Sequence, residues 1–155
     1  MKSDTFATAF FELLDETFEH VQGNYLDKGT SLFETLATVS AADASRSVSA
    51  TAASVAAHAR HVEFYLTVLE EVLQGKTPGK VDWNEIWRTT RVVSPAEWDG
   101  IRSRLRETYA RIVTLTKGFD TWEGEGQVSG ALAILVHTAF HLGAIRQVLR
   151  APASG

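Results

Sequence analysis

Apolar residues recur at the spacing of an α-helix in four long segments of this chain, at about residues 3–21, 51–74, 95–117 and 128–149. Spacings of three and four residues put such side chains on one side of a helix, where they can face a common core. No run alternates for long enough to predict a strand, and no fixed-period repeat is present. The pattern therefore predicts an all-α protein built as a four-helix bundle.

Glycine, proline and polar residues mark the ends of these segments. Ser94, Pro95 and Glu97 together predict a helix start, with the serine as cap, the proline in the first turn and the glutamate completing a capping box. Gly75 and Gly118 are expected to end the second and third helices. We therefore expect each helix to end before the next one begins.

The connection between the first two long helices, residues 23–50, is too long for a simple hairpin. We expect a short extra helix at about residues 27–39 and then a loop with a single turn. This length also predicts at least one crossover connection in the bundle. Residues 81–87 are aromatic and irregular, and we expect them to cover one end of the bundle.

The composition excludes several classes of function. The chain has 155 residues, which predicts one domain over residues 1–155, and 45% of them are hydrophobic. It has no cysteine, which excludes disulfides, thiolate metal sites and a cysteine nucleophile. A net charge of −4 and a pI of about 5.7 argue against a nucleic-acid partner.

Nothing in the sequence predicts export or a membrane partner. Acidic residues at Asp4, Glu12, Asp15 and Glu16 occupy the region where a signal peptide needs an apolar core. The most apolar stretch, residues 128–142, is interrupted by two histidines and falls short of a membrane span. We therefore expect a cytoplasmic protein.

Four of the five histidines form two pairs on expected helices. His58 and His61 are three residues apart, and His137 and His141 are four apart. Either spacing puts both rings on one side of a helix, and neutral imidazole is the commonest metal ligand among side chains. The two pairs predict a histidine-rich metal site between two helices. His20, near the end of the first helix, is expected to interact with the helix dipole and not with a metal ion.

A helical wheel distinguishes the two histidines of the second long helix. His58 lies about 40–60° from the middle of the apolar stripe, whereas His61 lies about 100° away, at its margin. We therefore expect His58, His137 and His141 to converge, with His61 as the alternative ligand. Three imidazoles with an open fourth position are typical of a catalytic zinc site, and nickel, iron or manganese could also bind. Spacing alone also permits surface histidines, or histidines that hydrogen-bond to backbone.

Other polar residues carry weaker predictions. Asp82, Trp83, Glu85 and Trp87 could line a pocket, although aromatic residues in a connection more often cover the end of a core. Arg146 could bind an anionic substrate or form a structural ion pair. The chain shows no paired carboxylates suited to acid–base catalysis, no glycine-rich phosphate loop and no nucleophile elbow.

Several segments of the chain also match a known family. Residues 57–62, 81–87, 97–98 and 137–147 are similar to those of the DinB-like (YfiT-like metalloenzyme) superfamily, the last segment being the most specific. The resemblance covers nearly the whole chain. It implies an up-down-down-up four-helix bundle, a homodimer, and one divalent metal ion, most often nickel or zinc, held by three histidines.

Carried onto this sequence, the resemblance assigns two ligands to His137 and His141 and the third to the stretch from His58 to His61, where His58 matches the family position. Characterised members include thiol transferases that use bacillithiol or mycothiol, and mycothiol-dependent maleylpyruvate isomerase. The resemblance implies that the metal lowers the pKa of a low-molecular-weight thiol, whose thiolate attacks an electrophile. Because this chain has no cysteine, the thiol would be a cosubstrate.

Two hypotheses about function follow. The first is a divalent-metal-dependent enzyme with S-transferase-like or hydrolase-like activity on a small electrophilic substrate. The second is a non-catalytic, dimeric metal- or ligand-binding stress protein that keeps the histidines of the family. A nucleic-acid-binding damage-response factor is disfavoured by the acidic pI. Elemental analysis and a thiol-consumption assay would separate the first two hypotheses.

Overall fold

The structure, a computed structural model, describes residues 3–152. Seven helices joined by loops form within these residues. No strand forms within these residues, so the prediction of an all-α chain is confirmed. The long helices are α1 (Ser3–Phe18), α4 (Val55–Leu73), α6 (Pro95–Lys117) and α7 (Gln127–Arg150). The short helices are α2 (Leu32–Ala37), α3 (Ala41–Ala44) and α5 (Glu85–Thr89).

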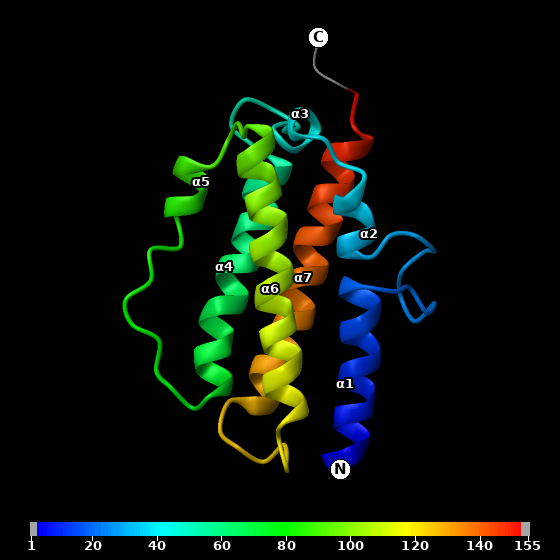
Figure 1. Ribbon diagram of the computed structural model, residues 1–155, viewed down its shortest axis with the longest axis vertical. Helices are drawn as coiled ribbons and strands as arrows, with labels where there is room; N and C mark the ends of the chain where they lie inside the picture. Colours follow the sequence, from blue (N-terminus) through cyan, green and yellow to red (C-terminus); the bar gives the residue numbers. More distant parts are fainter. Residues whose placement is uncertain (1–2, 153–155) are drawn as a thin grey trace.

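The four long helices lie side by side along the longest axis of the molecule (Figure 1). In this view α1 and α7 run upward, whereas α4 and α6 run downward. α4 packs mainly against α6 and α7, and α7 also packs against α1. The two helices that carry the histidine pairs, α4 and α7, are therefore neighbours.

The predicted start of α6 is confirmed in detail. The Ser94 hydroxyl accepts the backbone N–H of Glu97 at 3.3 Å, and the Glu97 carboxylate accepts the backbone N–H of Ser94 at 2.7 Å. Pro95 is the first helical residue. Both partners of the capping box are therefore satisfied, which fixes the point where this helix begins.

Other boundaries differ from the prediction. α1 ends at Phe18 instead of near residue 21, and α4 begins at Val55, after Ser54 as cap, instead of at residue 51. The short helix expected at about residues 27–39 is α2, which is shorter than expected, and the single turn expected after it is α3. The connection expected to be irregular contains α5. Ser40 caps α3 by accepting the backbone N–H of Asp43 at 3.1 Å. Helices as short as α3 and α5 bury too few apolar residues for a periodic pattern to define them.

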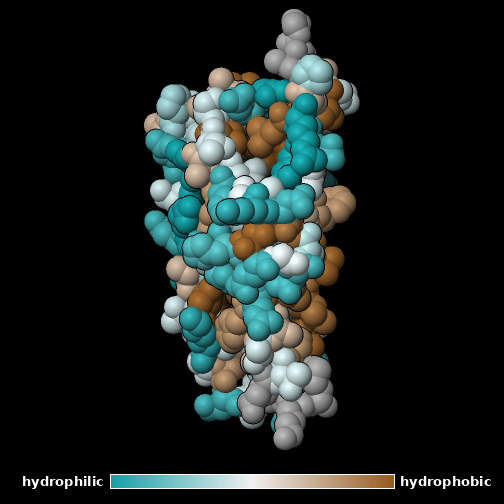
Figure 2. Space-filling view, turned by 90° about the vertical axis from the view of Figure 1, so that its right-hand side faces the viewer, coloured by the Kyte–Doolittle hydropathy of each residue, from teal (hydrophilic) through white to brown (hydrophobic). Residues whose placement is uncertain are grey.

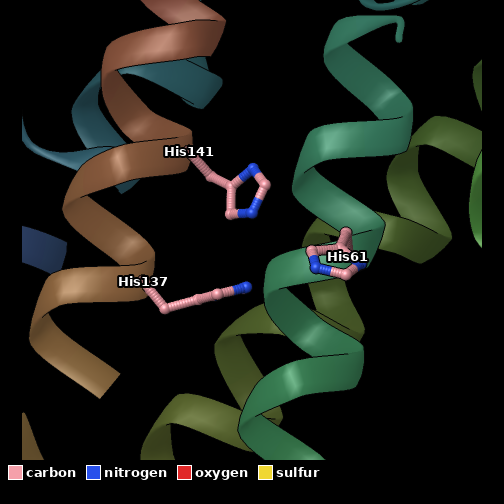
Figure 3. A group of neighbouring side chains, drawn as sticks. All are labelled: His61, His137 and His141. Atoms are coloured by element: carbon pink, nitrogen blue, oxygen red, sulfur yellow. The ribbon is translucent and has the colours of Figure 1, made fainter. Parts of the chain in front are cut away.

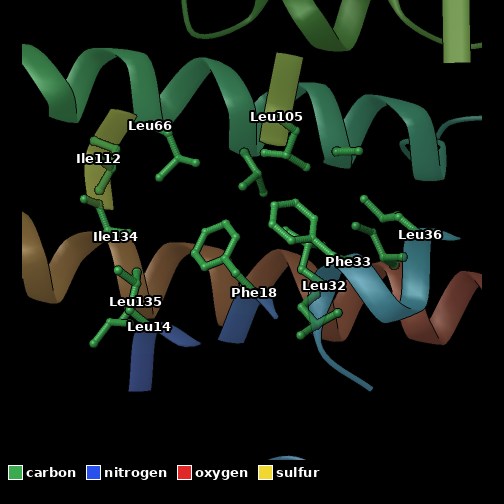
Figure 4. Packing of buried hydrophobic residues seen from close by; sticks show 14 of the residues in the cluster. Leu14, Phe18, Leu32, Phe33, Leu36, Leu66, Leu105, Ile112, Ile134 and Leu135 are labelled. Carbon is green, nitrogen blue, oxygen red and sulfur yellow. The ribbon is translucent and has the colours of Figure 1, made fainter. Parts of the chain in front are cut away.

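Buried apolar residues of the long helices and α2 form one continuous core (Figure 4). At one contact, the rings of Phe18, Phe33 and Tyr109 pack together with centroid distances of 4.6–5.7 Å. At another, Gly130 of α7 lies so close to α4 that a Cβ there would be 3.2 Å from the Leu73 side chain. The lack of a side chain at this glycine allows α4 and α7 to approach closely.

α7 is apolar on two sides. It is the one helix within residues 3–152 that is long and apolar enough to cross a membrane, although the core helix of a soluble protein meets the same criterion. Some of its apolar residues are buried in the core, whereas Leu132, Val136 and Phe140 are exposed at intervals of four residues. Figure 2 shows the surface that lies on the right-hand side of Figure 1. On this surface hydrophilic residues surround smaller hydrophobic areas, and hydrophobic residues gather along the right-hand edge.

Glu16 of α1 is a buried carboxylate that anchors the loop after its helix. Its two oxygens accept the backbone N–H groups of Asn24, Tyr25 and Leu26 and the side-chain amide of Asn24, at 2.7–2.9 Å. Burial alone would raise the pKa of this carboxyl, but the hydrogen bonds outweigh burial and lower the pKa from 4.5 to about 2. The ionised carboxylate therefore stabilises the fold through this loop.

We expect Glu16→Gln to lower the free energy of unfolding at pH 7 by about 2 kcal/mol, because an amide cannot accept all of these hydrogen bonds. Since folding lowers the pKa, the contribution of the charge is complete above about pH 4.5 and is lost as the pH falls through about 2. Urea denaturation across this range would therefore show the difference from wild type shrinking on acidification. Glu12→Gln, on the exposed side of the same helix, is the matched control. Equal stability of Glu16→Gln and wild type at pH 7 would contradict this role.

A candidate metal centre between α4 and α7

The packing of α4 against α7 brings both histidine pairs together. His61 of α4 and His137 and His141 of α7 each offer a ring nitrogen within 4.8 Å of the nitrogens offered by the other two. We call these three residues the histidine triad. Their ring centroids are 4.5–5.0 Å apart. Figure 3 shows the three rings pointing toward one another across the space between the two helices.

His58, one turn before His61, is joined to the triad through His141. Its Nδ1 lies 2.9 Å from the Nδ1 of His141, which is hydrogen-bond distance. The sequence predicted His58, His137 and His141 as metal ligands, with His61 as the alternative. The structure groups the two histidines of α7 with His61 and places His58 beside this group.

The helical wheel places His58 nearer the middle of the apolar stripe and His61 at its margin, but His61 has the smaller exposed fraction of the two, at 7%. The reason is a cover that comes from another part of the chain. Trp87 of α5 packs with its ring centroid 4.4 Å from that of His61, and Trp83 lies 6.3 Å away. A wheel describes one helix and does not include segments that later fold over its margin.

Aromatic rings enclose the histidines on several sides. Tyr65 stacks on His137 with a centroid distance of 3.6 Å and an interplanar angle of 12°. Trp87 also contacts His58 and His141, at 5.6 and 6.0 Å. Sequence reasoning overlooked Tyr65, although its position four residues after His61 predicts that it shares a side of the helix with that histidine.

The polar residues near these tryptophans have surface roles. Asp82 forms an ion pair with Arg88 at 2.6 Å, and both side chains are more than half exposed.

His20, the histidine outside the two pairs, lies beyond the end of α1 with its Nδ1 3.3 Å from the Asp15 carboxylate. Its place at the surface agrees with its expected exclusion from the metal site.

Burial favours the neutral form of all four paired histidines. It lowers the pKa of each ring below 6.5, and the other histidines lower the pKa values of His58, His137 and His141 further. The pKa of His137 falls to about 4 and that of His141 to about 3. Neutral imidazole has a free lone pair on one nitrogen, which is the form that binds a metal ion.

Some buried polar atoms of the site have no hydrogen-bond partner. These are Nδ1 of His61, Nδ1 of His137 and Oγ1 of Thr138, next to His137. An unpaired buried polar atom costs about 1–3 kcal/mol. A cation coordinated by the three rings would offset much of this cost, because its attraction for their lone pairs replaces the missing hydrogen bonds. The donor set therefore fits a divalent cation with three imidazole ligands and an open position.

A cavity of about 340 Å³ lies against the histidines. Its walls include His58 and His141, the rings of Trp87 and Phe140, and Arg91. Mostly apolar walls with a few polar groups are typical of small-molecule sites, and this volume is at the lower end of their range. A small molecule bound in this cavity would lie beside His58 and beside His141 of the triad.

Comparisons of the chain with protein-family models, curated proteins and solved structures found no match. The residues of the sequence and the geometry of the site therefore carry the functional argument.

We expect Trp87 to report the binding of a metal ion at the triad. Ni²⁺ quenches the fluorescence of nearby indole rings, and Trp87 contacts the triad directly. In a titration with Ni²⁺, Trp87→Phe should lose a large part of the quenching seen in wild type. The part that remains should come from Trp83, whose ring centroid lies 6.3 Å from that of His61. Trp122→Phe is the matched control, because Trp122 packs against Phe6 and Phe10 of α1. Equal quenching in wild type and Trp87→Phe would place the bound ion elsewhere.

Proposed function

We propose that this protein is a divalent-metal-dependent enzyme whose ion is held by His61, His137 and His141. The observation that carries the proposal is the convergence of three neutral imidazoles, two of them with a buried nitrogen that lacks a partner. We choose His61 over His58 as the ligand from α4, because His58 does not belong to the close group and its Nδ1 already contacts His141. Three protein ligands leave a coordination position for a reactant.

Imidazole ligands narrow the choice of metal. Nitrogen donors of intermediate softness suit zinc and nickel, and iron also binds histidine readily. Manganese prefers oxygen ligands and is the weaker candidate among the four metals expected from the sequence. We therefore propose zinc or nickel.

A divalent ion at this place would act as a Lewis acid and lower the pKa of a bound thiol or water molecule. The protein side chains have the remaining tasks. The triad would hold the ion, the tryptophans keep bulk water from the rings, and the cavity beside His141 has room for a small electrophile. Because the chain has no cysteine, a thiol nucleophile would have to be a low-molecular-weight thiol, and a water molecule is the other nucleophile in this proposal.

The arrangement of the long helices supports membership of the DinB-like superfamily. The directions of α1, α4, α6 and α7 in Figure 1 are up, down, down and up, the order that the resemblance implies. The placement of the histidines on α4 and α7 also agrees with it. We therefore propose a DinB-like bundle and, from the same resemblance, a homodimer. As expected from the sequence, we also propose a cytoplasmic location. The exposed apolar stripe of Leu132, Val136 and Phe140 is a surface that a second copy would cover.

The second candidate is a non-catalytic dimer that binds a metal or ligand. The deep burial of His61 and His141 is the observation that favours it, because a buried ion can stabilise a fold without reacting. The adjacent cavity favours the enzyme, since a purely structural metal site has no need of a space for a reactant.

Replacing a single triad histidine should remove stoichiometric metal. We expect His61→Ala, His137→Ala and His141→Ala to retain much less than one Zn²⁺ or Ni²⁺ per chain after dialysis, as measured by elemental analysis. His20→Ala, which removes an exposed histidine, is the matched control and should retain the wild-type amount. Circular dichroism would verify that each variant is folded. Full metal occupancy in any folded triad variant would refute the ligand assignment.

The enzymatic proposal requires metal-dependent chemistry on a small electrophile. We expect the metal-loaded protein to consume a low-molecular-weight thiol in the presence of at least one member of an electrophile panel, or to hydrolyse that electrophile without thiol. Removal of the metal with a chelator should stop the reaction, and added Zn²⁺ or Ni²⁺ should restore it. Stoichiometric metal without turnover of any panel member would favour the non-catalytic candidate.

A further inference from the structure

The fourth histidine of the cluster, His58, contacts a triad member through a single polar atom. Its Nδ1 is 2.9 Å from Nδ1 of His141, and the two ring centroids are 5.2 Å apart. Trp87 packs against both rings, and both line the cavity beside the triad. The contact is therefore held in place by aromatic packing.

This contact determines which nitrogen of His141 can bind a cation. Because Nδ1 of His141 faces His58, Nε2 is the nitrogen left for the ion. Figure 3 shows one ring nitrogen of His141 directed toward the side of the ring where His61 and His137 lie. Coordination through Nε2 therefore leaves the contact with His58 intact.

The same contact determines where the protons lie. A neutral imidazole has one N–H and one lone pair, so of two Nδ1 atoms in contact one donates and the other accepts. Coordination needs the lone pair of His141 Nε2, which puts the proton of that ring on its Nδ1. His141 is then the donor and His58 the acceptor, and the proton of His58 lies on its Nε2.

We propose that His58 is a positioning residue, whose Nδ1 accepts the Nδ1–H of His141 and fixes the orientation and tautomer in which His141 binds the metal ion. This inference rests on the proposed triad of ligands. Metal-binding histidines commonly donate their second N–H to a carboxylate or a carbonyl group, which orients the ring and raises its basicity. Here the acceptor is a neutral imidazole, which adds no negative charge and so leaves the bound ion a stronger Lewis acid than a carboxylate partner would.

The test compares two substitutions of His58. His58→Phe keeps an aromatic ring but removes the acceptor, and His58→Asn keeps a side-chain oxygen near the position of Nδ1. We expect His58→Phe to weaken Zn²⁺ binding about 10-fold to 100-fold, in competition with a chelator, and His58→Asn to recover most of the loss. His20→Phe is the control and should bind Zn²⁺ as wild type does.

A second measurement reads the tautomers directly. Long-range ¹H–¹⁵N NMR spectra of the zinc-loaded protein should show His141 protonated at Nδ1 and His58 protonated at Nε2. Unchanged Zn²⁺ affinity in His58→Phe, or a His141 ring without a proton on Nδ1, would overturn the role of His58 and leave the triad intact. Full Zn²⁺ binding by folded His61→Ala, together with its loss in both His58 variants, would instead make His58 a ligand and refute the triad itself.

Discussion

The close packing of α4 against α7 is the constraint on which the candidate site depends. Gly130, in the first turn of α7, presents no side chain to Leu69 and Leu73, and a Cβ there would lie only 3.2 Å from the Leu73 side chain. Further along the same contact, the histidine pairs of the two helices meet. If the two helices lay further apart by the width of another side chain, the two histidine pairs would not meet. Ring nitrogens from different helices could then not bind the same metal ion.

The site concentrates polar atoms where a core normally contains none. Burying an imidazole without partners costs free energy, and here four rings lie together with two ring nitrogens unpaired. Natural sequences break such local rules mainly at functional sites, and the rest of the fold supplies the stability. The aromatic rings of Tyr65, Trp83 and Trp87 help to hold the cluster, because they fill the space around the histidines. Trp87 links these features, because it covers the histidines at the α4–α7 contact and also lines the cavity.

Local signals predicted the helices well, but they predicted the site only in part. The box of Ser94 and Glu97 fixed the start of α6, because both of its hydrogen bonds are made within four residues. The spacing of His137 and His141 placed both on one side of α7 for the same reason. The choice between His58 and His61 was harder, since it depended on which ring of α4 lies close to both histidines of α7, and that follows from how the two helices pack.

The sequence by itself determined that the chain is helical, where α6 and α7 begin and end to within about one residue, and that two pairs of imidazoles lie on two helices. These properties depend on hydrogen bonds and side-chain spacings within a few residues. Only the tertiary structure decided which rings meet, that His61 joins the pair of α7, and that His58 reaches the Nδ1 of His141. Those outcomes depend on how closely two helices pack and on what covers them, and contacts between distant segments set both.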